Sequence, residues 1–383
     1  RELLEKTEGW ITGILLDPDG KQITGKSRPG SARVHGGGLG DFFLHLISQQ
    51  PREVYEMLLR SSLLEEFNPE RCEQVIGRAL ALPELNWRAL MDHIQQENLL
   101  VLPVGEDGSW LRYHHLFASF LQTQILREAP QEARAIERSL AEYHRRQGDW
   151  DDAFTLFHKL SLADEMVDLI EQAGPELLAN GRMSTLSTWL DTLPPELLSA
   201  RPFLVSLQGV IASTTGDWKL ALSLFDQAIH AMSLPHERHA LSRSFAWRAG
   251  TQRMVGNFDA AIADAHETIR LSENDLPLRK VKAEAMRCIG LCLDQQGKST
   301  EALEWLGQAL SITLSIKDKE NTAIIQLGLG VVYENLGKYT QSMSLYQAAL
   351  EHWRQTENFI WLSNLLNNLG VLQHITGDYK AAI

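Results

Sequence analysis

Residues 20–27 read GKQITGKS, which matches the pattern of a phosphate-binding loop letter for letter. In such a loop the backbone amides cradle nucleotide phosphates, the lysine reaches the outer phosphates and the serine hydroxyl binds magnesium. The chemistry requires a strand before the loop and a helix that begins at the lysine and serine. Here Pro29 and Gly30 occupy the first helical turn, and four more glycines follow closely. We therefore interpret residues 17–39 as a flexible, glycine-rich linker and not as a nucleotide site.

Other residues that could do chemistry are equally poorly placed. The DPDG stretch at 17–20 begins like a calcium loop, but the glutamate that should close the loop is replaced by Arg28. The cysteines Cys72, Cys288 and Cys292 cannot form a disulfide framework, and the last two would supply only half of a metal site. We expect buried, reduced thiols, no metal and no catalytic residues, so the chain is not predicted to be an enzyme.

The composition narrows the class of protein. The chain has 383 residues with a formal net charge of −13 and a pI near 5.5. Direct nucleic-acid binding is not expected, because phosphate backbones attract basic surfaces. No apolar run approaches the roughly 18 residues that span a bilayer, so we expect a cytoplasmic protein without a membrane contact. The start at Arg1 and the end at Ile383 within a helical pattern suggest a piece of a longer protein.

From about residue 131 one pattern recurs: glycine, a polar residue, usually an aromatic residue, two free positions, then alanine or serine. Its copies are GDWDDA (148–153), GDWKLA (216–221), GNFDAA (256–261), GKSTEA (297–302), GKYTQS (337–342) and GDYKAA (377–382). The last five glycines lie 40 or 41 residues apart, and the first gap of 68 leaves room for a degenerate unit around 181–190, where Leu186 replaces the small residue. Self-similarity at a fixed period indicates a repeat architecture.

The pattern has the physical features of a repeated helical hairpin. Glycine can adopt the left-handed conformation that ends a helix, and small residues let two helices approach closely. A second small residue lies seven positions before the turn glycines, at Ala141, Gly209, Ala249, Gly290, Gly330 and Gly370. The stretch LGVVYENLGKYTQSMSLYQAAL (329–350) resembles the tetratricopeptide repeat, although the period is about 40 instead of 34. We predict an α-α superhelix, or solenoid, over residues 129–383.

Residues 40–128 have a different pattern. FFLHLISQQPREVYEMLLRSSLLEEF indicates one helix, NPERCEQVIGRAL a second that begins at Asn68, and NWRALMDHIQQENLL a third. Two β-prone runs then flank GEDG at 105–108, which is a hairpin signal. Three helices followed by a hairpin predict a winged helix. The fold class is therefore mainly α: a winged-helix domain followed by a TPR-like superhelix.

Three stretches resemble one family: TEGWITGILL (7–16), LLRSSLLEEFNPERCEQVIG (58–77) and LRYHHLFASFLQ (111–122). They are similar to the MalT-type signalling ATPases of the STAND class, also called LAL regulators, which commonly end in a LuxR-type DNA-binding domain. The resemblance implies that residues 1–16 end a helical module of the nucleotide-binding region. It also implies that the nucleotide-binding core, with its ATP or ADP, lies in the parent protein outside this fragment, which itself holds no cofactor.

The same resemblance implies one nucleotide contact. Relatives hold ADP through a winged-helix histidine that opens a His-Asp-Leu stretch. In HHLFASFL (114–121), His114 takes the histidine position and His115 the aspartate position, a departure that weakens the case for a second contact. A histidine at the end of a wing strand can donate to a phosphate. It can also cap the following helix or pack against Trp110.

Repeat arrays expose a face lined by the first helix of each unit. Counted from the turn glycines, this effector or partner groove should contain Arg243, Arg253, Glu284, Arg287, Asp294, Gln295, Glu334, Asn335, Asn364, Asn367 and His374. The set is polar and could hold a small-molecule inducer, a peptide or a protein segment. The tryptophans at 150, 218 and 305 are predicted to be core residues.

Two functions fit these observations. In the first, the superhelix senses an inducer or partner protein, and the winged helix holds the parent's own nucleotide-binding domain in an ADP state until the signal shifts the population to ATP. The output would be transcription activation or oligomerisation into an effector platform. In the alternative, the repeats form a plain scaffold that docks a protein partner or effector without a nucleotide switch.

Overall fold

The computed structural model describes residues 39–82, 85–105, 108–233, 235–356 and 359–377. The candidate phosphate loop and the segments predicted at 1–16 and 17–39 lie outside the described residues, apart from Leu39. The chain forms two compact units that divide between Leu169 and Ile170. The predicted fold class is confirmed: the structure is mainly α, with a winged helix followed by TPR-like helical hairpins.

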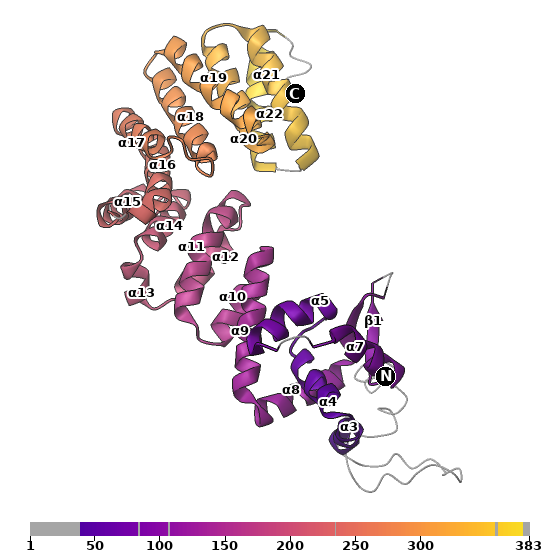
Figure 1. The fold of residues 1–383 in the computed structure, drawn as a ribbon. Coiled ribbons are helices and arrows are strands. Elements are labelled where there is room, and N and C mark those ends of the chain that lie inside the picture. Colours follow the sequence, from indigo (N-terminus) through magenta and orange to yellow (C-terminus); the bar gives the residue numbers. More distant parts are fainter. Residues whose placement is uncertain (1–38, 83–84, 106–107, 234, 357–358, 378–383) are drawn as a thin grey trace. The chain divides into compact units, whose positions relative to one another are not determined.

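The first unit contains the winged helix and one helical hairpin (Figure 1). Its elements are α3 (Leu39–Ser48), α4 (Arg52–Ser61), α5 (Pro69–Cys72), the π-helical η1 (Glu73–Gly77), α6 (Arg78–Leu80), α7 (Trp87–Gln96), β1 (Val101–Val104), β2 (Trp110–Tyr113), α8 (His115–Glu128), α9 (Pro130–Gln147) and α10 (Trp150–Lys159).

The wing is an antiparallel hairpin, as the sequence predicts. Val101 pairs with Tyr113 and Val104 with Trp110, and an isolated bridge joins Phe67 to Leu111. Two helices before the wing begin directly after an asparagine whose side chain caps the first turn. The Asn68 side chain accepts from the backbone N–H of Arg71 at 2.7 Å, and Asn86 caps α7 in the same way.

Two of the predicted helices in this domain are wrong in their extent. The segment 42–67 is not one helix, because Pro51 lacks an N–H and precedes α4, so α3 and α4 are separate. The segment that begins at Asn68 is divided into α5, η1 and α6, with π-helical hydrogen bonding over Glu73–Gly77.

The first hairpin, α9 and α10, packs on the winged helix within the same unit. The Arg71 guanidinium lies 5.7 Å from the ring centroid of Trp110 in the wing and 5.1 Å from that of Tyr143 in α9. Its Nη2 also contacts His144 Nε2 at 3.3 Å. On α4, Arg60 donates to Glu132 at 2.9 Å. Aromatic and ionic contacts thus join the wing, α4 and the first repeat.

The second unit is a series of helical hairpins. It begins within α11 (Ala163–Ala179) and continues through α12 (Met183–Asp191), α13 (Pro195–Ala200), α14 (Pro202–Thr214), α15 (Trp218–Ala231), the 3-10 helix η2 (Pro235–Glu237), α16 (Arg238–Met254), α17 (Phe258–Leu271), α18 (Arg279–Gln295), α19 (Ser299–Ser315), α20 (Lys319–Asn335), α21 (Tyr339–Thr356) and α22 (Phe359–Ile375). No helix among the described residues is long and apolar enough to cross a membrane.

The turn glycines have the backbone conformation that the repeat pattern requires. Their φ angles are positive, between 71° and 87°, at Gly148, Gly181, Gly216, Gly256, Gly297, Gly337 and Gly377. Gly181 lies in the turn between α11 and α12, where the degenerate unit was expected, and Leu186 of α12 lies close to Gly174 of α11. The small residues five positions after each glycine are fully buried where described: Ala153, Ala221, Ala261, Ala302 and Ser342, with Leu186 in the degenerate unit.

The prediction that the three tryptophans are core residues is wrong for Trp218, which is 40% exposed. Trp218 is the first residue of α15 and lies directly after the turn, where fewer neighbours surround a side chain than at mid-helix. Trp150 and Trp305 are half-buried. Tyr339, at the same repeat position as Trp218, is likewise 37% exposed. The buried small residues, more than these aromatic rings, form the contact between paired helices.

A substitution at Gly330 tests whether the close approach of the two helices in a hairpin is required for stability. A Cβ at Gly330 in α20 would overlap the ring of Tyr346, which is fully buried in α21. We expect Gly330→Ala to destabilise the chain by about 1–3 kcal/mol, because an overpacked core must shift its backbone. Urea unfolding followed by circular dichroism measures the change.

Gly307→Ala is the matched control. A Cβ at Gly307, within α19, meets no atom within 4 Å. This variant should be neutral or stabilising by up to about 1 kcal/mol, since alanine has the higher helix propensity. Equal effects of the two substitutions would show that close helix approach does not govern the hairpin.

Candidate functional site

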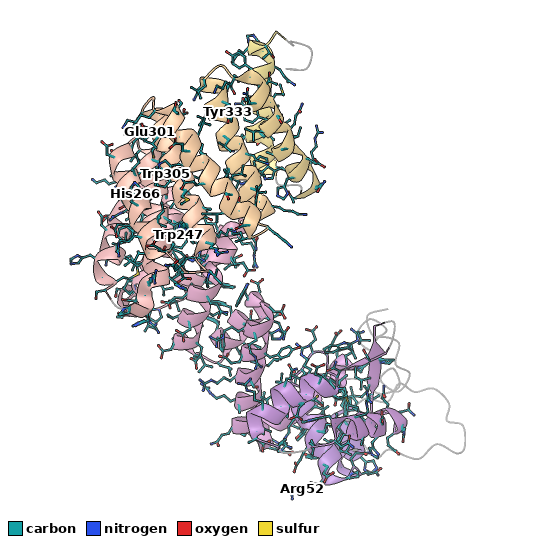
Figure 2. All side chains as sticks on the ribbon, turned by 45° about the horizontal axis from the view of Figure 1, so that its top comes forward. Arg52, Trp247, His266, Glu301, Trp305 and Tyr333 are labelled. Carbon is teal, nitrogen blue, oxygen red and sulfur yellow. The ribbon has the colours of Figure 1, made fainter. Side chains whose placement is uncertain are left out.

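The first helices of the repeats lie side by side. The helices α14, α16, α18, α20 and α22 contact one another in this order, and the first four also contact their own hairpin partners. Figure 2 shows the side chains that this unit carries. We call the surface that the predicted groove residues form on these helices the A-helix face. All eleven predicted groove residues lie on its helices.

Four predicted groove residues form a charged centre on two neighbouring helices: Arg243 and Arg253 on α16, and Glu284 and Arg287 on α18. Their side chains interact electrostatically. Burial raises the pKa of Glu284, and the positive charges of Arg287 and Arg243 partly oppose this increase. Burial lowers the pKa of Arg287, and the positive charge of Arg253 lowers it further. The sequence prediction therefore brings together residues that interact in space.

Lys280 and Asp318 also belong to the charged centre, although counting from the turn glycines missed them. Lys280 Nζ lies 3.6 Å from a carboxylate oxygen of Asp318, and both charges act on Glu284. Asp318 precedes α20 and accepts from the backbone N–H of Asn321 at 3.0 Å. The signal that could have found it is its position as an N-cap at the start of a repeat helix.

A second pair from the predicted set joins α18 to α20. The Asn335 amide donates to Asp294 at 2.7 Å, and the Ser299 hydroxyl donates to the other oxygen of the same carboxylate at 2.7 Å. Gln295 is exposed beside them. Asp294 is buried, so both of its oxygens are occupied by internal donors.

The other predicted groove residues do not join the charged centre. Glu334 accepts from the Tyr346 hydroxyl at 3.0 Å. Asn364, Asn367 and His374 are exposed on α22, two repeats away from α18. The A-helix face is therefore heterogeneous: charged at α16 and α18, and largely amide-bearing at its other end.

His114 lies at the junction between the wing and α8. Its side chain caps α8 by accepting from the backbone N–H of Leu116 at 3.4 Å, and its ring stacks on that of His115 with the centroids 4.5 Å apart. His114 is buried and His115 is exposed. The capping geometry is one of the two structural roles expected beside the nucleotide contact, and the nucleotide role stays a prediction.

The thiols of Cys72, Cys288 and Cys292 are free and buried, as predicted. In the part of the chain that the structure describes, no group of three or more histidine, cysteine or acidic residues could hold a metal ion.

Comparison with known proteins identifies families and proteins that this chain is similar to. Residues 44–133 match the MalT winged helix domain family, and residues 321–383 match the tetratricopeptide repeat family. The MalT transcriptional regulator of Cronobacter sakazakii is 28% identical over 213 residues, 54% of this chain and 23% of that protein. The MalT regulator of Klebsiella pneumoniae is 25% identical over 313 residues, 80% of this chain and 34% of that protein.

One solved structure has the same fold over most of the chain. It is a STAND protein with a tetratricopeptide repeat sensor from Pyrococcus horikoshii, with a TM-score of 0.62 and 16% identity, covering 93% of this chain and 52% of that one. The chain spans about a quarter to a third of the length of the curated relatives it matches.

The chain thus combines a winged helix with a tetratricopeptide repeat array. Its winged helix is of the MalT type, and the resemblance to the MalT-type STAND regulators is confirmed.

Some arginines of the second unit form salt bridges with carboxylates and others do not. Arg248 is one that does, and its substitution tests the structural role of such a pair. It donates to both oxygens of the buried Asp264 at 2.8 and 2.6 Å, and to Asp226 at 2.6 Å. We expect Arg248→Met to destabilise the chain by about 3 kcal/mol or more, because it leaves a buried carboxylate without its partner. Chemical unfolding at neutral pH measures this.

Arg270 provides the exposed comparison. Its side chain is 66% exposed and pairs with Glu267 within the same helix. Arg270→Met should change stability by no more than about 0.5 kcal/mol. If Arg248→Met were equally mild, the Asp264 pair would have no structural role.

Proposed function

We propose that this chain is the winged-helix and sensor portion of a STAND-type, ATP-dependent transcriptional regulator that acts in the cytoplasm. The observation that carries the proposal is the MalT-type winged helix followed, in one chain, by tetratricopeptide repeats. The relatives that cover most of this chain are named as transcriptional regulators.

In this proposal the repeats receive the signal. The A-helix face gathers polar and charged side chains from successive helices, and it binds a small-molecule inducer, a peptide or a partner protein. A ligand that contacts two neighbouring repeats shifts the equilibrium between two arrangements of the array, and the size of the shift is set by the difference between its affinities for them. The first hairpin relays the change, because α9 contacts the wing through Arg71, Trp110 and Tyr143.

The winged helix is proposed to control nucleotide exchange in the parent. His114 would contact the ADP phosphate in the parent's nucleotide-binding domain, with His115 adjacent. His114 lies at the end of β2 and its ring orientation is fixed by the α8 cap, which supports such a role. The proposal assigns neither direct nucleic-acid binding nor a membrane contact to this fragment. It assigns ATP hydrolysis, and oligomerisation in the active state, to the parent.

The His114 role is tested in the full-length parent protein. We expect His114→Ala to weaken ADP retention by roughly tenfold or more, since a charge-assisted hydrogen bond to phosphate is worth about 1.5–3 kcal/mol. The same variant should activate transcription without inducer. Fluorescent-ADP release and a reporter assay measure the two effects.

His230→Ala is the control, because His230 is exposed in the last turn of α15. It should change neither readout. A His114→Ala parent that melts earlier but retains ADP normally would show that His114 only caps α8. Calorimetry adds an independent check: the 383-residue chain alone should not bind ATP at micromolar concentration. A parent that responds to its ligand without any nucleotide dependence would favour the plain scaffold.

A further inference from the structure

Three arginines of the A-helix face lie beyond salt-bridge distance of every carboxylate that the structure describes. Arg243 and Arg253 lie on α16 and Arg287 on the adjacent α18. None of the three forms a salt bridge within the described ranges. The Arg253 guanidinium contacts the Met254 sulfur at 3.5 Å. On the same helix α16, Arg248 is fully paired with two aspartates. The fold therefore pairs the arginine that faces the hairpin interior and leaves those on the A-helix face unpaired.

The Arg287 side chain is the least satisfied of these groups. Its Nε is buried and has no hydrogen-bond partner among the described residues. A guanidinium stays charged at neutral pH. A buried donor without an acceptor destabilises the fold, and more so when the group is charged. This unsatisfied donor lies at a position that the repeat pattern places on the A-helix face.

The nearby acidic groups cannot satisfy the arginines. Glu284 is shared among Lys280, Arg287 and Arg243, and Asp318 pairs with Lys280. Asp264 is held by Arg248. Four cations, the three arginines and Lys280, thus face two carboxylates, Glu284 and Asp318, which leaves two positive charges. The chain as a whole carries −13, so this local excess of positive charge runs against its composition.

We propose that α16 and α18 form a binding site for an anionic group, a carboxylate or phosphate carried by the sensor's ligand, held by Arg287 and Arg253. The planar guanidinium matches the geometry of both anions and binds them bidentately. Arg243 interacts with Glu284 and adds to the positive field. This inference deepens the proposed sensor function and rests on it for its biological meaning.

The test uses the 383-residue chain with inorganic phosphate and glutarate as probes. Each is titrated at constant ionic strength against chloride and followed by thermal shift and calorimetry. We expect saturable binding of at least one probe, and the tighter of the two identifies the phosphate or the carboxylate source. Arg287→Gln and Arg253→Gln should each weaken that binding by about tenfold or more.

Two further variants keep the test decisive. Arg270→Gln removes an exposed, paired charge on α17 and should leave the affinity unchanged. Glu284→Gln removes a competing carboxylate and should strengthen binding several-fold. In chloride alone, Arg287→Gln should melt at the same temperature as the unaltered chain or higher, because it removes a buried guanidinium N–H that has no acceptor among the described residues.

The proposal is overturned if neither probe saturates, or if both shift the melting temperature equally in the unaltered chain and in Arg287→Gln. It is also overturned if Arg287→Gln in chloride melts several degrees lower, since Arg287 would then serve packing. Failure here leaves the regulator proposal standing, because His114 and ADP retention test that separately in the parent. Failure of the His114 test would likewise leave an anion site on α18.

Discussion

The close approach of two helices within each hairpin is the constraint on which the second unit depends. A buried small residue on one helix accepts a large side chain from its partner, as Gly330 accepts the ring of Tyr346 and Gly290 accepts Leu306. This contact sets which sides of the two helices are hidden. The remaining side of each first helix then lies next to its counterpart in the following repeat, so α16, α18 and α20 present one surface.

Charge on that surface is distributed in two distinct ways. Arg248 and Asp264, or Asp294 and Asn335, form pairs that join neighbouring helices and occupy the buried carboxylates. Arg287 and Arg253 repel one another, and burial makes that repulsion more costly. Pairs of the first kind stabilise the array. Open groups of the second kind lower its stability, and proteins commonly tolerate such groups where they bind something.

The winged helix and the first repeat share one core. Residues of α9 such as Ile136 and Leu140 are buried together with Phe117 of α8 and Ile94 of α7. The Arg71 side chain, between aromatic rings of the wing and of α9, adds a polar contact to this apolar one. A displacement of α9 is therefore felt at the wing and at His114, because packed cores transmit strain.

Local signals predict the repeat, its register and the hairpin of the wing: turn glycines, small residues at a constant spacing from them, and a GEDG turn between two β-prone runs. They also place Asn68 at a helix start and the groove residues on the correct helices. The prediction of one helix over 42–67 overlooked a further local signal, Pro51, which separates α3 from α4. No local signal predicts that Trp218 is 40% exposed. Which groove charges are paired follows from the folded chain alone, because pairing depends on distances between helices some 40 residues apart. Asn335 donates a hydrogen bond to Asp294 on the preceding first helix. Arg287 was predicted from the same repeat spacing, but its buried Nε has no acceptor among the described residues.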